Sequence, residues 1–126
     1  MHILLLEPNT VLADTYRQLF IKTGHTVAHS TSAQAAINAA DERRPDVVVL
    51  ELQLPQHSGI EFLHEFRSYP EWQRLPVVVH TFVTPPKLAI AREALARDLH
   101  VHTILYKPQT SLQDLLCAVG QAVETT

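Results

Sequence analysis

The chain of 126 residues has one cysteine, three glycines and no long hydrophobic run, and each scarcity excludes a class of protein. Because Cys117 is alone, no disulfide can form within the chain, and a reducing, cytoplasmic location is expected. Three glycines leave no glycine-rich loop of the kind that cradles the phosphates of a nucleotide. The apolar stretch 3–6 ends at Glu7 and Pro8, which is too short for a signal peptide or a membrane span.

The sequence also lacks an excess of basic residues. Ten Lys and Arg residues stand against thirteen Asp and Glu residues, which gives a net charge of −3. Without a basic surface, direct binding to nucleic acid is not expected, and neither is contact with a membrane. The length suits a single domain over residues 1–126 that buries its own core.

Short apolar runs are what the sequence does contain. Five of them occur, at 3–6, 27–28, 47–50, 77–79 and 101–105. Several are continuous rather than alternating, which is typical of strands buried on both faces of a parallel sheet. The segments between them carry apolar residues at helical spacing. Helix caps are expected at Asn9, Ser30 or Thr31, Ser58, Thr84 and Ser111.

The alternation of strand and helix predicts an α/β fold with helices on both faces of a parallel sheet. In such sheets ligands bind beyond the carboxyl ends of the strands. This rule selects the residues at or just past the predicted strand ends as candidates for a functional site. They are Glu7, Pro8, Glu51, Thr81 and Lys107.

Several segments at these strand ends resemble the receiver domain of response regulators. Segment 45–59 is similar to the region around the phospho-accepting aspartate of that family, and Glu51 occupies the acceptor position. Segment 76–81 resembles the fourth strand, which ends in a hydroxyl residue, here Thr81. Segment 105–108 resembles the end of the fifth strand, where a lysine precedes a proline, here Lys107 and Pro108.

The resemblance implies a flavodoxin-like, doubly wound sheet of strand order 2-1-3-4-5 with five helices, two on one face and three on the other. It also implies a place in two-component signalling, with a histidine kinase or an output domain as partner. The output surface would be formed by the fourth helix, fifth strand and fifth helix, with Arg92, Arg97 and Gln113 exposed and a homodimer as one arrangement. The bond before Pro108 is expected to be cis, as it is in that family.

The predicted acidic pocket departs from the family pattern at four positions. Glu51 replaces the acceptor aspartate, and Pro8 replaces one of the two acidic residues that hold a magnesium ion in the family. Phe82 follows Thr81, where the family has a small residue, and should narrow the pocket. Ile104 stands where the family has an aromatic side chain that responds to phosphorylation.

These departures alter the expected electrostatics of the pocket. Magnesium prefers six oxygen ligands in near-octahedral geometry, so we expect no cofactor, with a weak magnesium site on Glu7 and Glu51 as the alternative. Lys107 is expected to form an ion pair with Glu51 or Glu7, since a buried charge needs a partner. The interval from Thr81 to Lys107 is also about one helical turn longer than in the family, which predicts a longer fourth helix.

We therefore predict a degenerate receiver that is not an enzyme and acts as a phosphorylation-independent protein-interaction module. The Glu51 carboxylate would stand permanently where a phosphoryl group otherwise forms, directed at Thr81 and Lys107. One alternative is a receiver that still accepts a phosphoryl group from a histidine kinase. An alternative of another class is a small α/β enzyme that uses Glu7, Glu51 and Lys107 for acid–base chemistry.

Eight histidines raise the separate hypothesis of a metal site. His100 and His102 have the spacing of two ligands on one side of a strand, but no third ligand follows at a suitable spacing, so a metal is not favoured there. His80 lies within a predicted buried strand, where burial favours its neutral form.

Overall fold

The structure is a computed structural model that describes residues 1–125. Its five strands form one parallel sheet of order β2-β1-β3-β4-β5, which confirms the predicted flavodoxin-like topology. The strands are β1 (His2–Leu6), β2 (Thr26–Ser30), β3 (Val47–Leu50), β4 (Val77–Thr81) and β5 (Thr103–Tyr106). Every residue of β1, β3 and β4 is buried, as their continuous apolar runs predict.

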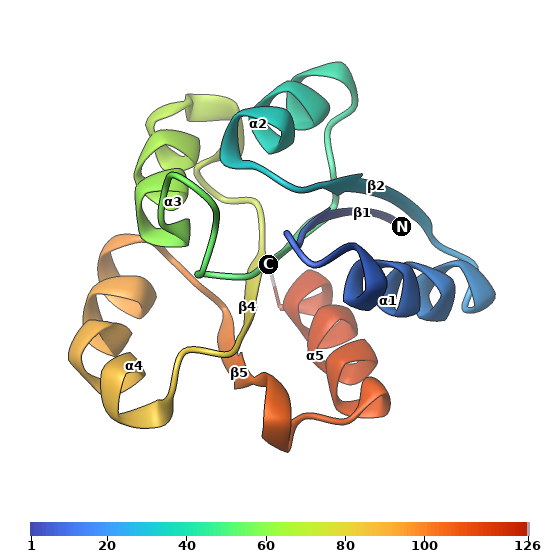
Figure 1. Cartoon of the computed structure of the whole chain (residues 1–126). Coiled ribbons are helices and arrows are strands. Elements are labelled where there is room, and N and C mark those ends of the chain that lie inside the picture. The colour runs from blue at the N-terminus through green and yellow to red at the C-terminus, as the bar shows by residue number, and fades with distance from the viewer. Residues whose placement is uncertain (126) are drawn as a thin grey trace.

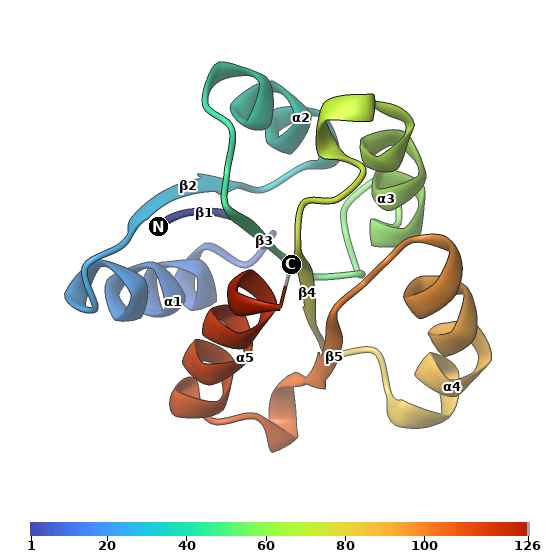
Figure 2. The ribbon, with the colours of Figure 1, turned by 180° about the vertical axis from the view of Figure 1, so that it is seen from behind.

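Five α-helices connect and cover the strands. They are α1 (Thr10–Lys22), α2 (Ala33–Glu42), α3 (Gly59–Ser68), α4 (Pro85–Glu93) and α5 (Leu112–Glu124). Helices α1 and α5 lie together on one face of the sheet, and α2, α3 and α4 cover the other, as predicted (Figures 1 and 2). No helix within residues 1–125 is both long enough and apolar enough to cross a membrane.

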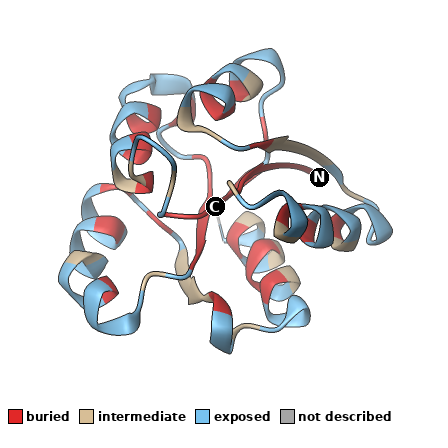
Figure 3. Ribbon diagram, in the orientation of Figure 1, coloured by how far each residue is buried: buried red, intermediate tan, exposed pale blue. Residues whose placement is uncertain are grey.

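The sheet separates two hydrophobic clusters, and its three central strands, β1, β3 and β4, form the buried centre of the fold (Figure 3). On the side of α2, α3 and α4 the cluster includes Phe62, Phe66 and Trp72, whose rings stack in sequence. On the side of α1 and α5 it includes Phe20 and Leu115, both fully buried. Alternating strand residues serve the two clusters in turn, which holds the carboxyl ends of the strands in fixed positions.

Side-chain caps begin most of the helices. Three of the predicted caps are confirmed, namely Asn9, Ser58 and Ser111. The prediction for α2 is wrong, because Ser30 is still paired within β2 and Ser32, two residues on, caps the helix. Thr84 occupies the cap position of α4 without a side-chain cap bond, and the helix begins instead with Pro85, whose fixed φ suits a first turn.

The fourth helix continues beyond its α-helical part. After α4 the chain continues in a π-helical turn, η2 (Ala94–Asp98), closed by the bond from the Leu99 amide to the Ala94 carbonyl. The segment ends at His100, whose φ of 53° lies in the left-handed region. Leu95 and Leu99 are both buried, so the extension is anchored in the core.

The start of α3 requires a glycine because two backbones approach closely there. A Cβ atom on Gly59 would lie 2.7 Å from the Cα of Leu52 and 3.0 Å from the carbonyl oxygen of Glu51. We predict that Gly59→Ala lowers the free energy of unfolding by about 1–3 kcal/mol, measured by urea denaturation. The matched control is Gly120→Ala in α5, where a Cβ meets nothing within 4 Å. That change should stabilise the helix by about 0.5–1 kcal/mol, and equal losses in both variants would contradict the packing argument.

His80 makes the stability of the fold depend on pH. Its ring is buried on β4 against Tyr16, with ring centroids 4.9 Å apart in an edge arrangement. The pKa of His80 is lowered from 6.5 to about 4, mainly by burial and also by the positive charge of Lys107, while Glu51 partly opposes the effect. Between those two values the unfolded chain binds a proton that the folded chain does not, so stability is full above pH 6.5 and falls as the pH drops toward 4.

We predict that His80 alone accounts for about 3 kcal/mol of the stability lost over that interval. In His80→Leu the loss between the two pH values should shrink by that amount, measured by urea denaturation at each pH. The control is His64→Leu at an exposed position on α3, which should lose as much stability between the two pH values as the wild type does. If His80→Leu loses as much stability between the two pH values as the wild type does, the His80 ring takes up its proton in the folded protein as it does in the unfolded chain.

Candidate functional site

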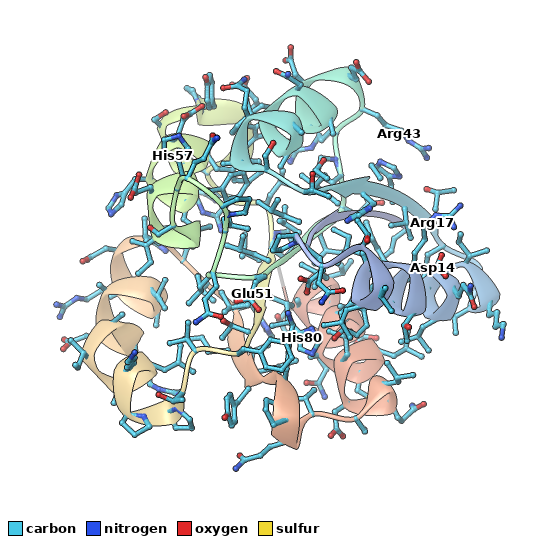
Figure 4. All side chains as sticks on the ribbon, in the orientation of Figure 1. Asp14, Arg17, Arg43, Glu51, His57 and His80 are labelled. Carbon is cyan, nitrogen blue, oxygen red and sulfur yellow. The ribbon has the colours of Figure 1, made fainter. Side chains whose placement is uncertain are left out.

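Four polar side chains predicted from the sequence meet at the carboxyl edge of the sheet. Glu7 follows β1, Glu51 follows β3, Thr81 ends β4 and Lys107 follows β5. All four are buried, and Figure 4 shows Glu51 near the centre of the fold with His80 close by. Parallel strands bring their carboxyl ends to one edge, so the topology alone assembles this pocket.

Lys107 lies between the two carboxylates and contacts both. Its Nζ atom is 2.5 Å from Oε1 of Glu7 and 2.6 Å from Oε2 of Glu51. The predicted ion pair is therefore confirmed with both partners. The three side chains are 3–4% exposed, so their attraction is little screened by water and salt.

The carboxylate of Glu51 accepts four hydrogen bonds. Oε1 accepts from the backbone amide of Gln53 at 3.0 Å and from the hydroxyl of Thr81. Oε2 accepts from the backbone amide of Phe82 at 3.1 Å and from Lys107. Each oxygen thus has two donors, which satisfies the carboxylate without water.

Glu7 is held in a similar way, with fewer partners. Its Oε1 contacts Lys107, and its Oε2 accepts from the backbone amide of Asn9 at 3.1 Å. Pro8, between Glu7 and Asn9 in the sequence, is half-buried and has no side-chain oxygen that could bind a metal ion. The pKa of the nearby Tyr16 is raised to about 12, mainly by burial and also by the negative charges of Glu7 and Glu51.

Phe82 covers the pocket and contacts the lysine. The Nζ atom of Lys107 lies 4.6 Å from the centroid of the Phe82 ring, an arrangement that attracts a cation to the aromatic face. The residue as a whole is 45% exposed, so it lies at the surface of the pocket. Sequence reasoning predicted a narrower pocket but missed this contact and both backbone amides that bind Glu51.

The prediction of a cis bond before Pro108 is wrong, because the bond is trans. Pro108 lies within a short 3₁₀ turn, η3 (Lys107–Gln109), where the missing amide hydrogen of proline is not needed. The amide of Thr110 closes this turn on the Lys107 carbonyl. Lys107 nevertheless enters the pocket as expected.

The donor set of the pocket does not fit a magnesium ion. Its two carboxylates, Glu7 and Glu51, are both bonded to Lys107, and Pro8 replaces a further ligand. Within residues 1–125 no group of three or more His, Cys, Asp or Glu side chains is arranged to hold a metal. His100 and His102 lie at the amino end of β5, far along the sheet from this pocket.

Comparison with known proteins identifies the family. Residues 3–119 match the family model of the response regulator receiver domain. The probable transcriptional regulatory protein TcrX of Mycobacterium tuberculosis is 37% identical over 79 residues, which are 63% of this chain and 33% of that protein. The polar-differentiation response regulator DivK of Brucella anthropi is 27% identical over 79 residues, 63% of this chain and 64% of that protein. Each match thus spans less than two thirds of the relative's length.

Solved structures agree with the fold. A sensor protein from Polaromonas sp. JS666 aligns with a TM-score of 0.86 at 22% identity, over 98% of this chain and 96% of that one. A CheY-like receiver domain protein from Methanospirillum hungatei aligns with a TM-score of 0.85 at 15% identity, over 98% and 94% of the two chains. Together with the strand order and the converging strand ends, these matches show that the chain belongs to the response regulator receiver domain family of two-component signalling.

Proposed function

We propose that this receiver domain works without phosphorylation, as a protein-interaction module held in one state by Glu51. The observation that carries the proposal is the complete set of donors around the Glu51 carboxylate. A hydroxyl, an ammonium group and two backbone amides already contact its two oxygens. A phosphoryl group on an acceptor at this position would need such donors for its own oxygens.

The same contacts oppose phosphoryl transfer to Glu51. An acceptor carboxylate must present a free oxygen in line with the incoming phosphorus, and both oxygens of Glu51 are engaged. Freeing Oε2 would remove one of the two carboxylate contacts of Lys107, and freeing Oε1 would leave the buried Thr81 hydroxyl without its acceptor, which costs about 1–3 kcal/mol. Misplacement of a reacting atom by about 1 Å costs roughly a hundredfold in rate.

A permanent carboxylate implies a permanent conformational bias. A switching domain needs two states and a group that interacts differently with each of them. Here the group that contacts Thr81 and Lys107 is part of the chain itself. Regulation would then come from the amount of protein and from binding of a partner.

The proposed partner is a signalling protein, either a histidine kinase or an output domain, bound at the surface of α4, β5 and α5. Arg92 and Gln113 are exposed there, as is the apolar Ile90 at 87%. Arg97 is exposed too, but it pairs with Glu93 at 2.9 Å. A homodimer through this surface is a further proposed arrangement. We propose no direct contact with nucleic acid or membrane, and a cytoplasmic location.

The pocket is also proposed to work without a cofactor. A weak magnesium site on Glu7 and Glu51 would have to displace Lys107 from both carboxylates before the ion could bind. Enzymatic acid–base chemistry by Glu7, Glu51 and Lys107 is not proposed, because the three groups are buried and bonded to one another. Family membership favours one second candidate, a receiver that still takes a phosphoryl group from a histidine kinase.

The ion pairs should make Lys107 the residue of the pocket on which stability depends most. We predict that Lys107→Met lowers the free energy of unfolding by about 3–5 kcal/mol, because Glu7 and Glu51 are left buried without a cation. Urea denaturation measures this loss. The exposed Lys87→Met on α4 is the control and should change stability by less than about 0.5 kcal/mol. Adding Glu51→Gln to Lys107→Met should recover part of the loss, and no recovery would contradict the pairing.

The proposed function itself is tested with a phosphoryl mimic. We predict that amide spectra of the wild type stay unchanged when beryllofluoride and magnesium are added, because Glu51 already engages the donors. The double variant Glu51→Asp with Pro8→Asp restores the acceptor and the acidic pair that the family resemblance implies. It should show shifts around Thr81, Phe82 and α4. Widespread shifts in the wild type would overturn the proposal in favour of the phosphorelay receiver.

A further inference from the structure

A second polar hollow lies at the opposite end of the sheet from the acidic pocket. It has a volume of about 590 Å³ and lies beside the amino ends of β4 and β5. Its polar lining comes from four segments of the chain and consists of Arg67, Gln73, Arg74, His100, His102 and Thr125. We call this hollow the basal pocket. Among the described residues 1–125, no acidic side chain is part of its lining.

Arg67 places a buried positive charge in the wall of the basal pocket. The residue is 9% exposed, and its guanidinium group donates to three backbone carbonyls. Nε donates to Leu99 at 3.0 Å, Nη1 to Trp72 at 2.6 Å and Nη2 to His100 at 3.2 Å. These bonds hold the group in one orientation. Within residues 1–125 no carboxylate forms an ion pair with it, so its charge is uncompensated.

The charge of Arg67 persists despite this burial. Burial lowers the pKa of Arg67 to about 10, which still leaves the group protonated at neutral pH. The bonded carbonyls contribute dipoles rather than a full negative charge, so an anion in the hollow would be attracted to the guanidinium group.

The other basic groups are accessible from solvent. Arg74 is exposed, and it forms no ion pair with any residue in the described part of the chain. His100 has a left-handed backbone, at a position after a helix where glycine is the usual residue, and its side chain lines the hollow. His102 is oriented by its ring contact with the Thr125 hydroxyl at 2.8 Å. Asp46, in the adjoining hollow, is bonded to the backbone amide of His2 at 2.6 Å.

The size and lining together indicate the class of ligand. Arginine presents its donors in a planar fork that matches the oxygens of a phosphoryl group. The volume is within the range of small-molecule pockets, and Leu75 and Pro76 add an apolar wall that an inorganic ion alone would not contact. We propose that the basal pocket binds a small phosphorylated molecule, with its phosphoryl group beside Arg74 and the two histidines and facing Arg67.

Amide spectra of the full chain test this proposal, with inorganic phosphate, ribose 5-phosphate, adenosine 5′-monophosphate and uncharged adenosine as probes. The amides of Gln73, His100 and His102 should shift with saturation for the phosphorylated probes and stay in place for adenosine. If the two phosphate esters bind more tightly than inorganic phosphate, the organic part of the ligand contacts the apolar wall. If inorganic phosphate binds with the same affinity as the two phosphate esters, the phosphoryl site is still supported, and free phosphate is then its ligand.

Two variants separate binding from general charge effects. Arg74→Gln should weaken binding of ribose 5-phosphate by about tenfold, the loss expected for one charge-assisted hydrogen bond. Arg92→Gln on α4 removes an exposed arginine outside the hollow and should bind as the wild type does. The proposal is overturned by any of three results: no saturable shift, equal shifts with adenosine, or wild-type binding by Arg74→Gln. Shifts with an acidic peptide alone would also overturn it and assign the surface to a protein partner.

Discussion

The structure depends on one buried cation placed between two buried carboxylates. Lys107 contacts Glu7 and Glu51 at 2.5 and 2.6 Å, and these residues follow three different strands. Removing Lys107 would leave two carboxylates without a cation in the interior, whereas removing one carboxylate would leave Lys107 paired with the other. The arrangement therefore joins β1, β3 and β5 across the carboxyl edge, and the fold and the proposed function depend on the same contacts.

The two acidic residues are oriented by the same local device. Glu7 accepts from the amide two residues on, at Asn9, and Glu51 accepts from the amide two residues on, at Gln53. Each of these local bonds orients a carboxylate immediately past a strand end. Thr81, Phe82 and Lys107 add the long-range contacts that hold the longer side chain of Glu51 in place.

Sequence patterns predicted most of this site, because its members lie at strand ends that apolar runs mark clearly. They did not predict that the backbone amides of Gln53 and Phe82 donate to Glu51. Nearly every residue has such an amide, and only the folded structure shows which of them lie near the carboxylate. The expectation of a cis bond before Pro108 came from the family resemblance. In the structure this bond is trans, and Pro108 lies within a local 3₁₀ turn. The basal pocket was missed for a different reason. Its two histidines are close in the sequence, but Arg67 lies more than thirty residues before them, and only the packing of α3 against the loop after η2 brings these residues together.

The π-helical turn after α4 has a consequence for the length of the chain. A π turn closes on the fifth residue back, so it contains one more residue than an α turn over nearly the same rise. The bond from Leu99 to Ala94 closes such a turn, while Leu95 and Leu99 stay buried on either side of the additional residue. A chain shorter by one residue in 94–98 can form an ordinary α turn between the same two anchors. Loss of one residue from this part of the domain should therefore leave β5 in place, so relatives that are one residue shorter are expected to have the deletion here.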